Sequence, residues 1–493
     1  MHDEHVDVLI VGAGLSGIGA GVHLQARCPG RSFALLEGRD AIGGTWDLFR
    51  YPGVRSDSDM FTLGYSFRPW TDSKAIADGP SILKYVRDTA REHGIDRRIR
   101  FGHRVRRASW SSEDARWTVE AERDGGQVAR FTCSFLFSCG GYYKYEAGYT
   151  PDFAGMGRFR GRLVHPQKWP EDLDYAGKRV VVIGSGATAV TLVPEMAETA
   201  AHVTMLQRSP TYVVARPSED GLANWMRRWL PPMVAYGITR WKKTLLQQYF
   251  FNLCRRRPAY TKQLILRGVR AYLGPDYDVD THFTPRYNPW EQRMCLVPDG
   301  DLFRAIRSNK ASVVTDTIET FTEKGIRLKS GAELEADVVV TATGLDLEIL
   351  SGIQLSVDGV RVDPPKTFNY KGLMYSGVPN FATSFGYTNA SWTLKCDLTC
   401  EYVCRLLNHM KKHGYTRCTP RFDDPSVTAV PWVDFSSGYI QRKLHLFPKQ
   451  GSKAPWKLRQ NYALDIMTLR FGRIDDGVME FTGAPAGRIA RRA

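Results

Sequence analysis

The fold is decided by residues 6–37, which read VDVLIVGAGLSGIGAGVHLQARCPGRSFALLE. The apolar run 6–11 predicts a buried strand, the glycine turn that follows leads into a helical pattern extending to Gln25, and residues 33–37 predict a second strand that ends in an acid. This strand–turn–helix–strand order is typical of a unit that binds the diphosphate of a dinucleotide.

Each small residue of this turn has a separate expected task. Gly12 permits the tight turn, Gly14 lets backbone N–H groups approach the phosphates, and Gly17 lets the helix pack closely on the strand. Glu37 is expected to accept hydrogen bonds from the adenosine ribose. A glycine turn without a ligand is the alternative, and the flanking strands and Glu37 argue against it.

A second unit follows at residues 179–209, RVVVIGSGATAVTLVPEMAETAAHVTMLQRS. Its turn carries Gly184 and Gly186, and Ala189 stands where the third glycine would be. After its second strand come Arg208 and Ser209, in place of an acid. A cation beside a hydroxyl suits a 2′-phosphate, so the first unit favours FAD and the second favours NADPH, although Arg208 could also be a solvated surface arginine.

Two nucleotide units in 493 residues indicate an α/β flavoprotein with two Rossmann-like domains, the NADP domain being inserted in the FAD domain. Residues 336–344, ADVVVTATG, are expected to form a further strand, and they resemble the segment that links the two domains in flavoproteins of this kind. Residues 386–394 are expected to form a loop that directs the N-terminus of the following helix, which extends to about Met410, toward the flavin ring. The expected boundaries are as follows: 1–145, FAD domain, first part; 146–215, NADP domain, first part; 216–283, helical insertion; 284–345, NADP domain, second part; 346–493, FAD domain, second part, and C-terminal tail.

Two further patterns lie outside the glycine turns. Residues 159–170, FRGRLVHPQKWP, fit FxGxxxHxxxWP at every fixed position, and residues 43–57, GGTWDLFRYPGVRSD, fit [AG]GxWxxxx[FY]P[GM]xxxD. On these patterns the chain resembles the type I Baeyer–Villiger monooxygenases. Residues 288–293, 297–303 and 387–394 resemble the ethionamide-activating branch of that family, and the resemblance covers nearly the whole chain.

The resemblance implies a FAD-containing, NADPH- and O₂-dependent enzyme that converts ketones to esters or lactones through a C4a-peroxyflavin and also oxidises thioethers to sulfoxides. Arg293 matches the arginine that sits over the flavin, and Asp57 matches the acid that orients it. His165 matches a linker histidine that couples NADP binding to domain motion; a direct acid–base role and a merely packed histidine are the alternatives. Many relatives have a lysine where Gln292 stands, which leaves Arg208 and Ser209 to supply the NADPH preference.

The same resemblance carries over the cofactor contacts position by position. For FAD they are Gly12, Gly14, Ser16, Gly17, Glu37, Thr45, Trp46, Asp47, Leu48, Asp57 and the backbone of Val105, which could also be an ordinary strand valine. For NADP they are Arg55, Ser56, Asp57, Gly184, Ser185, Gly186, Ala187, Thr188, Ala189, Val190, Arg208 and Ser209.

The cysteines argue against two other functions, a dithiol reductase and a metal site. No CxxC pair exists, which argues against a dithiol reductase. Cys396, Cys400 and Cys404 recur at helical spacing without a further ligand, so we expect a buried helix face and no metal site. Flavin-containing N- or S-monooxygenases remain the alternative function, and an NADPH-flavin reductase with a membrane-docking helical segment is an alternative of a different class.

The net charge of +15 is concentrated in residues 221–270, which hold eleven Lys or Arg, no Asp or Glu, and interleaved aromatic residues. This segment could line the substrate entrance or touch an anionic membrane surface peripherally; no nucleic-acid motif accompanies it, so no nucleic-acid partner is expected. Nine scattered cysteines, no leader at the first residues and no run of 18 apolar residues favour a cytoplasmic protein. The oligomeric state stays open.

Overall fold

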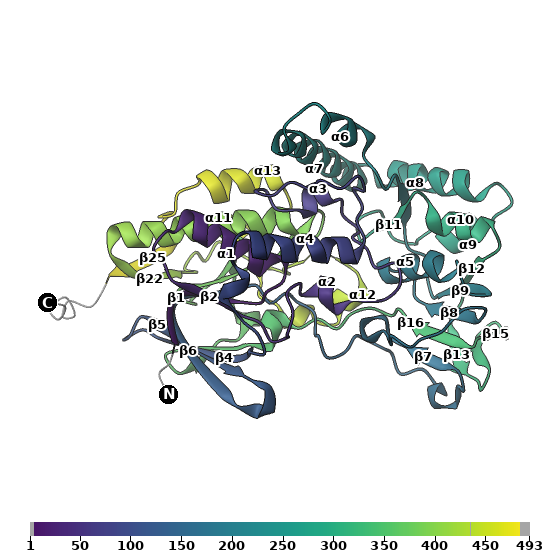
Figure 1. Cartoon of the computed structure of the whole chain (residues 1–493), viewed down its shortest axis with the longest axis horizontal. Coiled ribbons are helices and arrows are strands. Elements are labelled where there is room, and N and C mark those ends of the chain that lie inside the picture. The colour runs from purple at the N-terminus through teal and green to yellow at the C-terminus, as the bar shows by residue number, and fades with distance from the viewer. Residues whose placement is uncertain (1–3, 434, 484–493) are drawn as a thin grey trace.

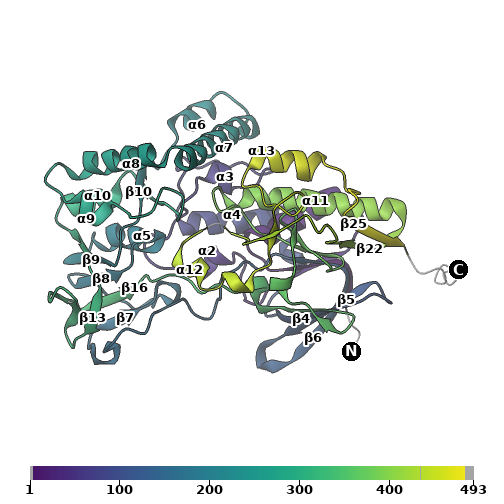
Figure 2. The ribbon, with the colours of Figure 1, turned by 180° about the vertical axis from the view of Figure 1, so that it is seen from behind.

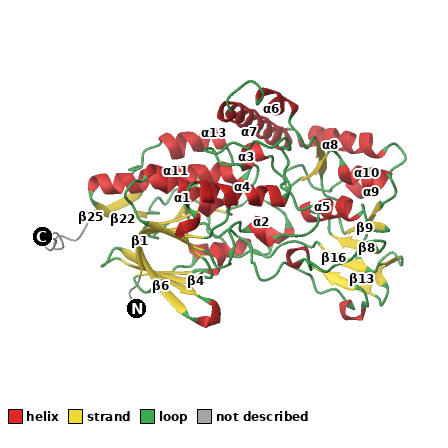
Figure 3. Ribbon diagram, in the orientation of Figure 1, coloured by secondary structure: helices red, strands yellow, loops and turns green. Residues whose placement is uncertain are grey.

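The computed structural model describes residues 4–433 and 435–483, and it contains two large β-sheets, each built around one of the glycine turns (Figures 1 and 3). The first sheet lies on the left of Figure 1 and the second on the right. The turn after the first strand and the turn after β8 therefore belong to different sheets, as expected for two Rossmann-like units.

The first sheet has nine strands in the order β18-β17-β4-β5-β6-β1-β2-β3, and β21 also pairs with β6. Its central strand β1 is parallel to both β2 and β6, with Ile10 opposite Leu35 and Phe137. Residues 8–10 are completely buried because helices and further strands cover both faces of this parallel part, which explains the uninterrupted apolar run. The strands are β1 (Glu4–Val11), β2 (Phe33–Leu36), β3 (Ile99–Arg100), β4 (Arg104–Ser111), β5 (Arg116–Glu122), β6 (Val128–Ser138), β17 (Gln354–Val357), β18 (Val360–Arg361) and β21 (Phe381–Thr383).

The second sheet has five parallel strands in the order β12-β9-β8-β16-β7. They are β7 (Arg162–Val164), β8 (Arg179–Ile183), β9 (His202–Gln207), β12 (Ala311–Thr315) and β16 (Val338–Thr341). The chain leaves the first sheet after β6, forms the second, and returns with β17 and β21. The predicted fold class, an NADP domain inserted in a FAD domain, is confirmed, whereas the boundaries between the domains stay predictions.

Helices cover both sheets. Helices α1, α4 and α11 share one apolar core with β1 and β6, and α5, α8 and α10 share another with β8 and β9. The helices are α1 (Leu15–Arg27), α2 (Thr45–Leu48), α3 (Met60–Leu63), α4 (Gly79–Glu92), α5 (Ala187–Met196), α6 (Gly221–Met226), α7 (Pro232–Arg256), α8 (Pro258–Leu273), α9 (Val279–Phe283), α10 (Asp301–Arg307), α11 (Trp392–His413), α12 (Gly438–Gln441) and α13 (Tyr462–Asp465), which continues into a π-helix, Ile466–Phe471.

Short ladders complete the molecule and lie around the two sheets. They are β10 (Val213–Arg216) with β11 (Cys295–Pro298); β13 (Ile318–Phe321), β14 (Gly325–Leu328) and β15 (Glu333–Glu335); β19 (Asn369–Tyr370) with β20 (Met374–Tyr375); β22 (Tyr415–Pro420) with β25 (Met479–Gly483); and β23 (Ala429–Val430) with β24 (Gln450–Gly451). Residues 221–283 form α6 to α9, in agreement with the helical pattern of this stretch. Across residues 4–433 and 435–483, no helix combines the length and the apolar character that crossing a bilayer requires.

Candidate active site

A cavity of about 420 Å³ extends from the first glycine turn to the start of α5, the helix that follows the second turn. Its wall includes the first turn, the loop 43–46, the segment 54–58, the start of α5, and Arg293. Twelve of the residues expected at the cofactors line the cavity together with Arg293. They are Gly12, Gly14, Ser16, Glu37, Thr45, Trp46, Arg55, Ser56, Asp57, Val105, Ala187 and Thr188.

The first glycine turn forms a cradle that fits a diphosphate. Gly12 has φ +100°, and a Cβ atom at Gly17 would lie only 1.9 Å from the Gly12 carbonyl oxygen. Helix α1 can start at the turn only because Gly17 lacks a side chain. Its N-cap residue is Gly14, which has no side chain to cap the first N–H groups, so these donors are left for a ligand.

Glu37 lies at the end of β2 and is buried at the cavity wall. Its carboxylate accepts hydrogen bonds from the Ala13 N–H at 2.7 Å and from the Arg39 N–H at 3.0 Å. Burial raises the pKa of Glu37 above its ordinary value, and the two N–H donors oppose that shift. The carboxylate is therefore fixed beside the turn, where its remaining lone pairs can accept from a ribose.

Arg293 and Asp57 meet at this cavity although 236 residues separate them. The guanidinium Nε lies 2.9 Å from Asp57 Oδ2 and its Nη2 lies 3.1 Å from Asp57 Oδ1, which is a two-point contact. Asp57 raises the pKa of Arg293 further above its ordinary value, so the cation persists at every working pH. The two side chains are 39% and 29% exposed, so the pair faces the open space of the cavity.

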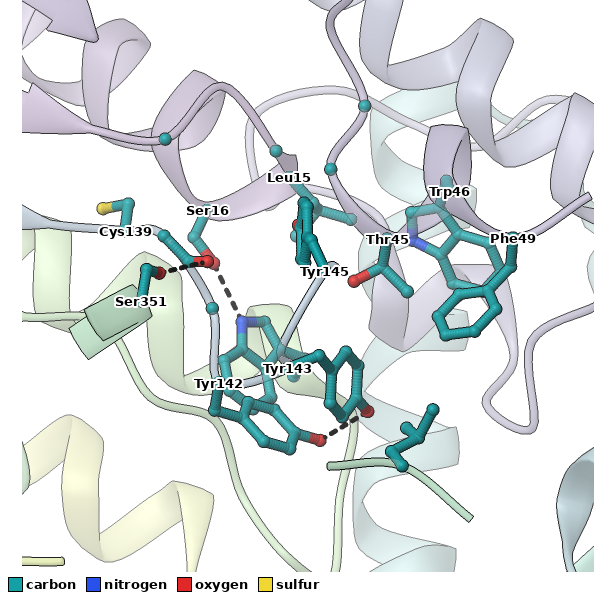
Figure 4. A pocket seen from close by; sticks show the side chains of 18 of the residues that line it. Leu15, Ser16, Thr45, Trp46, Phe49, Cys139, Tyr142, Tyr143, Tyr145 and Ser351 are labelled. Atoms are coloured by element: carbon teal, nitrogen blue, oxygen red, sulfur yellow. Dashed lines mark hydrogen bonds between the residues drawn. The ribbon is translucent and has the colours of Figure 1, made fainter. Parts of the chain in front are cut away.

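The wall that includes Arg293 is completed by Trp392, from the expected segment 387–394, and by Tyr142 and Tyr143, which the motifs did not indicate; Figure 4 labels the two tyrosines. Trp392, the first residue of α11, donates its Nε1–H to Ser16 Oγ at 2.8 Å and stacks on Tyr142 with ring centres 5.0 Å apart. The hydroxyls of Tyr142 and Tyr143 lie 2.7 Å apart. Ser351 Oγ donates to the Gly140 carbonyl at 2.8 Å and so fixes the loop after β6.

A smaller recess of about 40 Å³ adjoins the cavity at Arg293. Apart from Arg293 and Thr388, its wall is aliphatic or aromatic: Tyr142, Leu347, Phe385, Tyr387, Trp392, Val433, Phe435, Tyr439, Ile440, Leu444 and Phe447. Such a wall favours an apolar guest and places its polar group, if it has one, at the guanidinium.

The second glycine turn faces the same cavity through the start of α5. Its N-cap, Gly186, has no capping side chain, so the first N–H groups of α5 are left for a ligand as well. Arg55 contacts Asp301 Oδ2 through Nη1 at 2.5 Å, but its buried Nη2 has no hydrogen-bond partner among the described residues. An unpartnered guanidinium nitrogen beside an uncapped helix start fits an anionic or amide-bearing coenzyme.

Other expected contacts lie away from the cavity wall. Gly17, Gly184, Ser185, Gly186, Ala189 and Val190 shape the two turns and helix starts, and Arg208 and Ser209 are exposed at the end of β9. Ser185 Oγ holds this end by bonding the Ser209 carbonyl at 3.2 Å. Leu48 ends α2, and Asp47 is buried between Arg39 and Arg87, at 2.6 and 2.9 Å, so it anchors α2 rather than facing a ligand.

His165 also lies outside the cavity wall. Its ring packs against Gly148, where a Cβ would come within 2.0 Å of Cε1, and its Nδ1 accepts from the Gln167 N–H at 3.2 Å. Its buried Nε2 has no partner within residues 4–433 and 435–483. Burial lowers the pKa of His165 below its ordinary value. His165 therefore lies directly after β7 of the second sheet and packs against Gly148 in the segment that crosses from the first sheet to the second.

All nine cysteines are free and buried. Cys396, Cys400 and Cys404 lie on the inner face of α11, and Cys396 accepts a hydrogen bond from Ser384 at 3.0 Å. No group of three or more His, Cys, Asp or Glu residues in the described part of the chain has the arrangement of a metal site.

Comparison with known proteins adds a family to this geometry. Residues 64–237 match the model of the family described as flavin-binding monooxygenase-like, and residues 10–76 match an NAD(P)-binding Rossmann-like domain. The chain is 55% identical over 484 residues to the FAD-containing monooxygenase EthA of Mycobacterium tuberculosis (strain ATCC 25618 / H37Rv), which covers 98% of this chain and 99% of EthA.

Two solved structures of similar fold contain bound nucleotides, NADP in one and FAD with NADP in the other. An oxidized steroid monooxygenase bound to NADP superposes with a TM-score of 0.71 at 25% identity, covering 84% of this chain and 87% of that one. OTEMO in complex with FAD and NADP gives a TM-score of 0.68 at 25% identity, covering 85% and 88%.

Proposed function

This chain belongs to the FAD-containing monooxygenases, and from that membership we propose that it is a Baeyer–Villiger monooxygenase that converts ketones to esters or lactones and oxidises thioethers to sulfoxides. Its cofactors are FAD and NADP. The observation that carries the proposal is the Arg293–Asp57 pair, because it puts a permanent cation in the cavity that is lined by the first glycine turn and by the start of α5.

The cofactors, when bound, supply the hydride and the activation of dioxygen. The two helix starts would hold their diphosphates: α1 through the turn at Gly12 and Gly14, and α5 through the turn at Gly184 and Gly186.

Arg293 stabilises the negative charge that develops on oxygen during the reaction. Two of its five N–H donors are used by Asp57, and no other hydrogen bond to the guanidinium is made within the described residues. Three donors are therefore left for a reacting oxygen. Asp57 is a positioning residue, since its two contacts fix the plane of the guanidinium before the substrate arrives.

The recess beside Arg293 is where the ketone or thioether is proposed to bind. Its apolar wall accepts the two carbon substituents of the carbonyl and leaves the oxygen at the guanidinium. The rings of Tyr142, Tyr143 and Trp392 pack together at this point, and a bound apolar substrate would complete their cover and limit the access of water to the reacting oxygen.

His165 is proposed to act in the linker. Its distance from the cavity wall argues against direct proton transfer to a substrate, and its position beside Gly148 in the connection between the sheets favours coupling of coenzyme binding to domain movement. Arg208 and Ser209 are proposed to bind the 2′-phosphate of NADPH at the end of β9.

The test is product analysis under ¹⁸O₂ with NADPH, using linear, cyclic and aryl ketones together with aryl methyl thioethers. Esters or lactones carrying one labelled oxygen are expected. N-oxides or sulfoxides from suitable substrates, with no ester from any ketone, would instead make the chain a flavin-containing N- or S-monooxygenase. NADPH consumption that yields only reduced flavin or hydrogen peroxide with every substrate would refute the oxygenase proposal.

A further inference from the structure

Helices α6 and α7 expose an unusual number of large apolar side chains. Trp229 is 74% exposed, Tyr249 is 66% exposed and Leu245 is 59% exposed. The full set on these two helices and the turn between them is Leu222, Trp225, Trp229, Met233, Val234, Ile238, Trp241, Leu245, Leu246 and Tyr249, which we call the aromatic patch.

On α7 the patch is a continuous stripe. Positions 234, 238, 241, 245 and 249 recur at intervals of three or four residues and so lie on one face of the helix. The opposite face, which includes Tyr236 and Arg240, is buried on α3: Arg240 donates to the Phe61 and Gly64 carbonyls at 2.9 and 2.7 Å. The exposed apolar stripe is therefore not the face by which α7 packs into the core of this chain, because the opposite face already does so.

The stripe continues onto the C-terminal part of the chain. Trp241 contacts Tyr462 of α13 with ring centres 5.8 Å apart. Beyond Tyr462, the side chains of Leu464, Met467 and Phe471 are exposed on α13 and the π-helix. Figures 1 and 2 show α6, α7 and α13 along the same edge of the molecule from both sides.

The same edge is cationic. Residues 221–270 contain eleven Lys or Arg and no acid. Lys242 and Lys243 pair with Asp220, each at 2.8 Å, while Arg228 beside Trp229 and Arg256 at the end of α7 are exposed. Arg256 falls seven residues after Tyr249 and therefore on the apolar stripe itself.

We propose that the aromatic patch docks on the surface of an anionic lipid bilayer. Tryptophan and tyrosine are favoured at the headgroup level, flanking arginines are attracted to anionic lipids, and apolar side chains between them enter the acyl boundary. The three kinds of side chain lie on one exposed edge, and no helix there spans the bilayer, so the contact is peripheral.

Charge favours a bilayer over a second copy of the chain. A symmetric dimer through this edge would bring the same patch of each copy together. The two facing surfaces would each carry exposed arginines. Residues 221–270 contain no acid, so nothing in that segment would offset the electrostatic repulsion between them. Anionic headgroups neutralise the same charges.

Docking at this edge brings the bilayer close to the recess at Arg293. Helix α7 contacts its surroundings through Phe251 and Trp290, whose ring centres are 5.7 Å apart, and through Gln247 Nε2, which donates to the Asn389 carbonyl at 3.0 Å. Trp290 and the loop at Asn389 flank residues of the recess wall. Apolar substrates dissolved in the bilayer are thus concentrated beside the site, whichever oxygenation reaction takes place there.

The test is co-sedimentation of the FAD-loaded full chain with vesicles of phosphatidylcholine alone or of phosphatidylcholine with about 30% phosphatidylglycerol. Binding is expected to the anionic vesicles, at low salt above all. The double variant Trp229→Glu/Leu245→Glu is expected to lower the partition coefficient about tenfold or more. The control Val128→Glu/Val360→Glu alters exposed side chains of β6 and β18 with the same charge change and is expected to reduce binding much less.

Bound flavin and the far-UV circular dichroism melt of each variant serve as fold controls. Failure of the parent protein to sediment with anionic vesicles at low salt would overturn the proposal. Equal loss of binding in the patch and control variants would also overturn it, because a general charge effect would then explain the result. Self-association that the patch variant abolishes, without vesicle binding by the parent, would assign the patch to a second copy.

Discussion

Among residues 4–433 and 435–483, Arg293 is the only charged side chain that lines both the cavity and the apolar recess, and replacing it with alanine removes that charge. The structure leaves three guanidinium N–H donors beyond the two that Asp57 uses. Loss of one preorganised donor to a developing oxyanion typically costs about 3–4 kcal/mol, or two to three orders of magnitude in rate. We therefore expect the rate of ester formation by Arg293→Ala to fall at least about a hundredfold.

The assay measures ester, NADPH consumption and hydrogen peroxide together, with FAD content determined from the absorbance of the purified protein. Bound FAD is expected to stay near the parental level, because the cradle at Gly12, Gly14 and Gly17 does not involve Arg293. NADPH consumption that continues with hydrogen peroxide as the product would show that the oxygenation step, rather than coenzyme binding, is lost.

Arg293→Lys and Arg160→Ala provide matched controls. The lysine keeps the charge but cannot make the two-point contact with Asp57, so an intermediate rate is expected. Arg160 pairs with Glu323 on the surface, and its loss is expected to leave the rate within about threefold of the parent. If Arg293→Ala formed ester as fast as Arg160→Ala, the reasoning from the guanidinium would be refuted.

Three further predictions concern the cradle, the linker and the thiols. Gly17→Ala is expected to abolish FAD binding, because its Cβ would lie 1.9 Å from the Gly12 oxygen. Gly237→Ala, in open space on α7, should retain FAD and gain about 0.5–1 kcal/mol of stability. Absorbance measures the bound FAD, and chemical denaturation measures the stability. Burial lowers the pKa of His165, so the stability that its neutral form contributes is present above about pH 6.5 and is lost as the pH falls toward the folded-state pKa. Between about pH 7.5 and about pH 5.5, the melting temperature of His165→Gln should therefore fall less than that of the parent. An equal fall in the two proteins would contradict this prediction. The nine buried cysteines should react with a thiol reagent only after denaturation. A pair that reacts rapidly in the native enzyme would instead support the alternative function of a dithiol reductase.

The fold was predictable because its signals are local. The two glycine turns set the backbone over a few residues, and each is flanked by apolar runs long enough for a buried parallel strand. The helix expected after residues 386–394 is α11, although it begins within that stretch, at Trp392, and extends to His413. The order of the strands in the first sheet was harder to predict. Strands β17 and β21 join that sheet from more than 200 residues beyond β6, and their short apolar runs do not indicate which strands they pair with.

The candidate site was predictable only in part. The pairing of Arg293 with Asp57 spans 236 residues and was available only through the family resemblance. Tyr142 and Tyr143 were missed because they lie in a loop after β6, where neither helical nor strand periodicity applies. Asp47 was expected at the cofactor, and the sequence did not indicate that its side chain pairs with Arg39 and with Arg87, which lies 40 residues further along the chain.

The bond from Trp392 Nε1 to Ser16 Oγ, across 376 residues, has a consequence for biosynthesis. The phosphate cradle leaves the ribosome early, but its tryptophan wall and the strand β21 that covers β6 emerge only after the entire inserted domain has been translated. The inserted domain, whose strands are closer together along the chain, is then the first part able to complete its own core. The cradle gains its tryptophan wall only in the last quarter of translation, and until then residues 136–138 of β6 lack one of the two strands that pair with them.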